Sequence, residues 1–124
     1  MESLPDEIFL AALSSVSDAV MITDAQPNEP GPHILYVNTA FEKTSGYQLG
    51  EIRGRSIAVL QGPDTDPVVL QQAREALAAG EAFQNRIRIY KNDGTSFIAE
   101  WKLVPYSGAS GRPEYYISTL RELT

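Results

Sequence analysis

The last third of the chain alternates hydrophobic and polar residues with a period of two, which predicts three β-strands. The strands cover 83–90, 97–104 and 114–120, and they are joined by the Asn92–Gly94 turn and by a loop at 107–113. Asp-Gly between alternating segments is a strong hairpin signal. The alternation assigns one inward face, whose members are Phe83, Asn85, Ile87, Ile89, Phe97, Ala99, Trp101, Leu103, Tyr116, Ser118 and Leu120. We therefore expect an antiparallel meander with one face against a core.

The beginning of the chain predicts a helix followed by two short strands. Residues 3–15 carry apolar residues at helical spacing, with Pro5 in the first turn, where proline is tolerated. The apolar runs 19–23 and 34–37 predict buried strands, and the three prolines in 25–33 predict a loop between them. The N-terminal helix has two interpretations: it caps the domain, or it pairs with another chain.

Helix signals also follow the second strand. Asn38 or Thr39 can cap a helix, and Gly46 is a typical residue for ending it. The segment 47–53 predicts another helical turn or two.

A longer helix is predicted from Pro67 to about Ala79. Asp66 is a favoured N-cap residue, proline suits the first helical position, and Gly80 is a typical stop. Together with the strands, these helices predict an α+β fold in which the helices lie on one side of an antiparallel sheet.

Composition and charge narrow the function classes. A length of 124 residues suits one domain, and we expect a capping or dimerisation helix over 1–16 followed by the domain over 17–124. The net charge of -6 argues against a nucleic acid or an anionic membrane as partner. The absence of cysteine excludes disulfides, thiolate metal sites and cysteine nucleophiles. No metal site is expected, because the single histidine, His33, reads as a surface loop residue. No apolar run approaches the roughly 20 residues of a membrane span, so we expect a cytoplasmic domain.

Six segments resemble the signatures of the PAS domain, and specifically of its light-oxygen-voltage (LOV) subgroup. They read, in chain order, S-D-A-V-M-I-T-D-A (17–25), Y-V-N-T-A-F (36–41), T-S-G-Y (44–47), G-R-S-I-A-V-L-Q-G-P-D-T-D-P (54–67), Y-K-N-D-G-T (90–95) and R-E-L-T (121–124). The resemblance implies a PAS fold: a five-stranded antiparallel sheet in the order 2-1-5-4-3, with short helices and one longer helix over one face, enclosing a ligand pocket.

The same resemblance shows which flavin-site residues of the subgroup are replaced. The photoreactive cysteine falls on Ile57, and the arginine that pairs with the flavin phosphate falls on Ala58. Two strand asparagines fall on Ile89 and Ala99, and the glutamine of the last strand falls on Leu120. Gln61 and Arg74 remain.

These replacements lead us to expect that flavin binding is lost and that the chain has no cofactor. The polar edge of a flavin ring, buried against aliphatic side chains, would leave hydrogen-bonding groups unpaired at about 1–3 kcal/mol each. Three such groups would lower the affinity by several orders of magnitude, since about 1.4 kcal/mol is tenfold.

Two interpretations of the inward face stay open. Its side chains line an apolar pocket for another ligand, or they fill the pocket and form ordinary core. Asn85 either bonds to nearby backbone or recognises a ligand. The candidate lining residues are Ile57, Gln61, Arg74, Asn85, Ile87, Ile89, Ala99, Trp101, Ser118 and Leu120.

The resulting functional hypothesis is a sensory and interaction domain of a bacterial-type signalling protein, and not a flavin photoreceptor. The residues form no catalytic constellation, so the domain itself is not expected to be an enzyme. The resemblance implies an output domain such as a histidine kinase, a cyclic-di-GMP enzyme or a transcription regulator. We expect a homodimer through the N-terminal helix and the outer sheet face. The alternative is a receptor for an apolar metabolite or a non-photochemical cofactor.

Overall fold

The computed structural model describes residues 6–26 and 32–123, so the predicted helix start at 3–5 and most of the predicted loop at 25–33 lie outside the described residues. The strands are β1 (Ala19–Asp24), β2 (Ile34–Val37), β3 (Phe83–Tyr90), β4 (Ser96–Ser107) and β5 (Pro113–Glu122). They form one antiparallel sheet in the order β2-β1-β5-β4-β3, which confirms the predicted α+β fold class and strand order.

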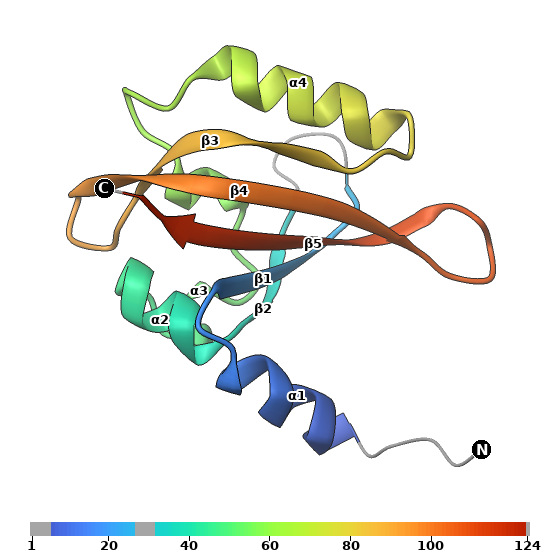
Figure 1. Cartoon of the computed structure of the whole chain (residues 1–124), viewed down its shortest axis with the longest axis horizontal. Coiled ribbons are helices and arrows are strands. Elements are labelled where there is room, and N and C mark those ends of the chain that lie inside the picture. Colours follow the sequence, from blue (N-terminus) through green and yellow to red (C-terminus); the bar gives the residue numbers. More distant parts are fainter. Residues whose placement is uncertain (1–5, 27–31, 124) are drawn as a thin grey trace.

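The helices gather at two places around the sheet. They are α1 (Asp6–Ser15), α2 (Thr39–Ser45), α3 (Leu49–Ile52), the 3₁₀ turn η1 (Ile57–Leu60) and α4 (Pro67–Ala78). Figure 1 shows α4 running alongside β3, whereas α2 and α3 lie near β1 and β2. Helix α1 projects away from the rest of the chain toward the N-terminus, and it contacts α2.

The capping residues predicted from the sequence start the two main helices. Asn38 is the N-cap of α2, and Gly46 ends this helix in the left-handed conformation at φ +80°. The side chain of Asp66 accepts a hydrogen bond from the backbone N–H of Val68 at the start of α4. The sequence did not predict η1, which Ser56 caps by accepting a hydrogen bond from the N–H of Ala58.

Asn38 also joins α1 to the rest of the fold. Its Oδ1 accepts hydrogen bonds from the backbone N–H groups of Val20 and Phe41, at 2.9 and 3.0 Å. Its Nδ2 donates to the carbonyl oxygens of Leu13 at the end of α1 and of Asp18 before β1, at 2.8 and 3.1 Å. A single side chain, 1% exposed, therefore connects α1, β1 and α2.

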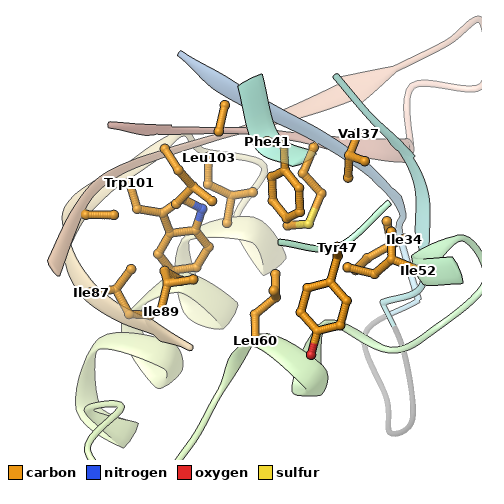
Figure 2. Close-up of a cluster of buried hydrophobic side chains, with 14 of the residues drawn as sticks. Ile34, Val37, Phe41, Tyr47, Ile52, Leu60, Ile87, Ile89, Trp101 and Leu103 are labelled. Atoms are coloured by element: carbon orange, nitrogen blue, oxygen red, sulfur yellow. The ribbon is translucent and has the colours of Figure 1, made fainter. Parts of the chain in front are cut away.

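The inward face of the sheet is divided into two halves by the strand register. The packed half is filled by core side chains, and Figure 2 shows Ile87, Ile89 and Leu60 within this cluster. Its further members on the strands are Ala19, Phe97, Ala99 and Leu120. The open half holds Met21, Thr23, Leu103, Tyr116 and Ser118, in which Met21, Ser118 and Leu103 lie opposite one another on β1, β5 and β4.

Candidate ligand cavity

A cavity of about 380 Å³ lies over the open half of the sheet. Helix α4 and the segment around η1 form one wall, and β1, β4 and β5 form the other. Its apolar lining comes from Met21, Pro32, Ile57, Ala58, Leu70, Ala73, Leu77, Ala78, Trp101 and Leu103. Its polar lining comes from Thr23, Ser56, Gln61, Gln71, Arg74, Glu75, Tyr116 and Ser118. A mostly apolar concavity with a few polar groups is the usual form of a small-molecule site.

The ten residues predicted to line a pocket fall into two groups. Ile57, Gln61, Arg74, Trp101 and Ser118 lie on the cavity wall. The other five are outside its lining, and they are Asn85, Ile87, Ile89, Ala99 and Leu120.

The residues outside the lining have other surroundings. Ile87, Ile89, Ala99 and Leu120 are buried in the packed half, and Ala99 is 0% exposed. Asn85 is half-buried on the edge strand β3, where its Oδ1 accepts a hydrogen bond from the backbone N–H of Arg86.

The sequence missed four lining residues on the strands, namely Met21, Thr23, Leu103 and Tyr116. All four belong to the buried side of the sheet, and alternation placed Leu103 and Tyr116 on the inward face. Alternation distinguishes inward-facing from outward-facing residues, but it does not show which inward-facing residues of different strands lie opposite one another. That alignment depends on the register between β1 and β5, which are far apart in sequence.

The polar groups of the cavity differ in how fully their hydrogen bonds are used. The indole Nε1 of Trp101 donates to Ser118 Oγ at 3.1 Å, and the hydroxyl of Thr23 donates to the carbonyl oxygen of Asp24. Arg74 donates from Nε and Nη2 to the side-chain oxygen of Gln71. Within the described residues, the side-chain amide of Gln61 makes no hydrogen bond, so it is available to a ligand.

A carboxylate–imidazole pair lies beside the cavity. Asp24 Oδ2 and His33 Nδ1 are 3.0 Å apart, and Asp24 Oδ1 accepts a hydrogen bond from the backbone N–H of His33 at 2.9 Å. Burial opposes ionisation of Asp24, but the hydrogen bonds from His33 outweigh it and hold the pKa of this carboxyl below its ordinary value. His33 was expected to be a surface loop residue, and the structure adds that its partly exposed ring pairs with Asp24.

The pair is linked to the cavity wall by backbone contacts. His33 forms a bridge with Ser56, and the N–H of Ile57 donates to the carbonyl oxygen of Pro32 at 3.1 Å. Pro32, Ser56 and Ile57 all line the cavity. In the described part of the chain, no cluster of three or more acidic or histidine side chains could hold a metal ion. No helix there is long and apolar enough to cross a bilayer.

Curated relatives of the chain include light-activated kinases. Blue-light-activated histidine kinase 1 of Erythrobacter litoralis is 32% identical over 120 residues, which are 97% of this chain and 33% of the relative. Phototropin-1A of Oryza sativa subsp. japonica is 37% identical over 103 residues, which are 82% of this chain and 11% of the relative. The chain thus spans about a third or less of the length of these relatives.

Solved structures of LOV proteins share the fold. An RNA-binding light-oxygen-voltage receptor superposes with a TM-score of 0.86 at 31% identity, covering 98% of this chain and 35% of that one. A light-oxygen-voltage domain studied with a flavin analogue superposes with a TM-score of 0.81 at 27% identity, covering 94% of this chain and 85% of that one.

These comparisons contradict the expectation that the chain has no cofactor. Several relatives are named blue-light-activated histidine kinases, and one structural neighbour is a LOV domain studied with a flavin analogue. The physical argument for loss assumed that Ile89, Ala99 and Leu120 face the ligand, whereas these three residues lie outside the cavity lining in this structure.

A protein-family model matches most of the chain. The model described as PAS domain matches residues 17–124, which is most of the sequence and includes all five strands. The helices, the strand order and the LOV relatives agree with this match. The chain belongs to the PAS domain family and is a sensory domain related to its LOV members.

Proposed function

We propose that this chain is a sensory domain that binds a flavin-class ligand non-covalently in the cavity and regulates an output domain. The observation that carries the proposal is the cavity itself, which has about 380 Å³ of space and a mostly apolar lining. This volume is within the roughly 300–1,000 Å³ of small-molecule sites. The LOV relatives make a flavin the first ligand class to test.

The lining residues suit a flat ring with a charged tail. Leu70, Leu77 and Leu103 offer apolar contact to a ring system. Arg74 is exposed at the cavity, and its guanidinium is the cation that would pair with a phosphate, while the free amide of Gln61 would bond to the polar tail. A bound flavin would supply absorption of blue light. The 124 residues include no cysteine, so the covalent thiol chemistry of the subgroup is not proposed for this chain.

Absorption spectroscopy tests the ligand class. We expect the purified chain, mixed with flavin mononucleotide and freed of excess by gel filtration, to retain the ligand and its visible absorption. Arg74→Ala should lower the affinity for flavin mononucleotide more than the affinity for riboflavin, because only flavin mononucleotide carries the phosphate. An exposed arginine away from the cavity, Arg112, provides a matched control as Arg112→Ala. Failure of both flavins to bind at millimolar concentration would overturn the flavin proposal.

A second candidate ligand is an apolar metabolite, which the large apolar share of the lining favours. Native mass spectrometry of the protein purified without added ligand distinguishes the two candidates. A bound mass that lacks visible absorption would favour the metabolite, and a flavin mass would favour the first proposal.

The output domain is proposed from the relatives. Two of them are histidine kinases and are about three to four times as long as the aligned segment. We propose a cytoplasmic signalling protein in which this domain is non-catalytic and acts on a kinase. A cyclic-di-GMP enzyme and a transcription regulator are the other outputs to be considered.

The outer face of the sheet supports a homodimer. Tyr36, Ile22, Ile117 and Val104 lie directly opposite one another across β2, β1, β5 and β4, and they form an apolar ladder on the outer face. Val104 is 46% exposed, so the ladder is open to a second copy of the chain. Light scattering of the purified protein should give the dimer mass, and Val104→Glu should shift it to monomer. A wild-type monomer at high micromolar concentration would refute the dimer.

A further inference from the structure

Trp101 and Ser118 form a buried polar pair at the cavity. The indole Nε1 of Trp101 donates to Ser118 Oγ at 3.1 Å, across the neighbouring strands β4 and β5. The ring of Phe83 packs edge-on against the indole, with centroids 5.6 Å apart and planes at 72°. These two contacts fix the indole, which Figure 2 shows within the core cluster. The hydrogen bond from Trp101 also occupies one lone pair of the Ser118 hydroxyl oxygen.

The hydrogen of the Ser118 hydroxyl has no acceptor among the described residues. The side chain is 2% exposed and belongs to the cavity lining. A serine hydroxyl can donate one hydrogen bond and accept two, and here only an accepted bond is present. A buried donor without an acceptor is unfavourable, so this group favours a ligand or a water that brings an acceptor into the cavity.

Tyr116 presents a second hydroxyl two residues earlier on the same face of β5. Its side chain lines the cavity and is 7% exposed, and its hydroxyl makes no hydrogen bond within the described part of the chain. Burial, and then the charge of Asp24, raise the pKa of Tyr116 above its ordinary value, so the phenol keeps its proton near neutral pH. Residues two apart on a strand are separated by about 6.6 Å.

The neighbours of these two hydroxyls on the sheet do not compete with them. Met21 and Leu103, which lie opposite Ser118, are apolar. Thr23 lies opposite Tyr116, but its hydroxyl donates to the carbonyl oxygen of Asp24 at 2.9 Å. The strand wall of the cavity therefore offers a ligand one pair of free hydroxyl donors, both on β5.

We propose that Tyr116 and Ser118 recognise a flat ligand by donating hydrogen bonds to acceptor atoms along one of its edges. The inference rests on the proposed ligand-binding function and defines the ligand class more narrowly: a largely apolar ring system that carries carbonyl oxygens or ring nitrogens on the edge facing β5. Recognition then depends on central-strand hydroxyls, and Ile89, Ala99 and Leu120 contribute packing alone.

Two tricyclic probes of similar size test this recognition. Alloxazine carries carbonyl oxygens and ring nitrogens on its edge, and anthracene carries none. Trp101 is the single tryptophan of the chain and lines the cavity, so quenching of its fluorescence reports the binding of either probe. We expect Ser118→Ala and Tyr116→Phe each to lower the affinity for alloxazine about tenfold, which corresponds to the loss of roughly one hydrogen bond. The affinity for anthracene should stay within about twofold of the wild-type value.

Two further variants separate recognition from packing. Thr23→Val removes a cavity hydroxyl that is already hydrogen-bonded within the protein, and it should change the affinities for the two probes equally. Ser118→Thr keeps the hydroxyl and should retain the preference for alloxazine even if it lowers stability.

The outcomes distinguish the two proposals. If wild-type protein binds neither ring, the ligand-binding function fails and the recognition inference fails with it. Suppose that wild-type protein binds both rings, and that Ser118→Ala and Tyr116→Phe lower the affinities for the two rings equally or not at all. The ligand-binding proposal is then retained, and the recognition inference is overturned. A loss confined to alloxazine in these two variants, absent in Thr23→Val, supports the inference.

Discussion

Replacing Asn38 by alanine tests whether one side chain holds three elements together. The amide accepts hydrogen bonds from the N–H groups of Val20 and Phe41 and donates to the carbonyl oxygens of Leu13 and Asp18. Asn38→Ala removes all four bonds at once. The two carbonyl oxygens lie in partly buried surroundings, whereas the two N–H groups are buried.

The magnitude follows from these contacts. Loss of the N-cap at Phe41 costs about 0.5–2 kcal/mol. The N–H of Val20 is left buried without a partner, at about 1–3 kcal/mol. The carbonyl oxygens add less, because water can reach partly buried groups. A total of about 2–5 kcal/mol is a large share of the roughly 5–15 kcal/mol that stabilises a typical domain.

Urea denaturation followed by circular dichroism measures this loss. Asn38→Ser keeps an acceptor for the α2 cap and loses the other bonds, so its free energy of unfolding should lie between wild type and Asn38→Ala. Thr39→Ala, at the adjacent exposed position, is the matched control and should change the free energy by less than about 0.5 kcal/mol. A loss below about 1 kcal/mol for Asn38→Ala, or an equal loss for Thr39→Ala, would refute the reasoning.

Three further substitutions test other local features. The pKa of Asp24 lies below its ordinary value because its hydrogen bonds with His33 outweigh its burial, so its stabilising contribution is present above about pH 4 and is lost as the pH falls through the folded pKa. When urea denaturation is repeated from neutral to acidic pH, the free energy of unfolding should decrease less steeply for Asp24→Asn than for wild type. Gly62→Ala would put a Cβ 2.5 Å from the ring of Tyr90, and should lower the free energy of unfolding by about 1–3 kcal/mol; an unchanged melting temperature would contradict this. Asp66→Ala should cost about 1 kcal/mol through loss of the α4 cap, measured by the same denaturation assay.

Local sequence signals predicted most of the elements. The strand β3 begins and ends at the predicted residues, and the helix caps Asn38 and Asp66 act as expected. These features depend on residues close together in the chain, where alternation, capping and glycine stops act directly. The turn η1 was missed, because its four residues Ile57–Leu60 are too few to produce a helical pattern.

The cavity could be predicted only in part, because it depends on contacts between distant segments. Ile57, Gln61 and Arg74 were found through the resemblance to the LOV subgroup. Ile89 and Leu120 were correctly assigned to the inward face, but they belong to a core cluster that also draws on Phe41, Tyr47 and Leu60 from distant segments of the chain. Asp24 and His33 lie 9 positions apart in the sequence, and no local pattern links the two residues.

The arrangement of β1 and β5 links the cavity to the outer surface. Met21 and Thr23 line the cavity, and Ile22 between them belongs to the outer apolar ladder. Tyr116 and Ser118 line the cavity in the same way, with Ile117 between them on the outside. Because successive residues of a strand share a backbone and point to opposite faces, a displacement of either strand by a ligand also moves its ladder residue. A ligand bound in the cavity and a partner bound on the outer face would therefore contact the same two strands, β1 and β5.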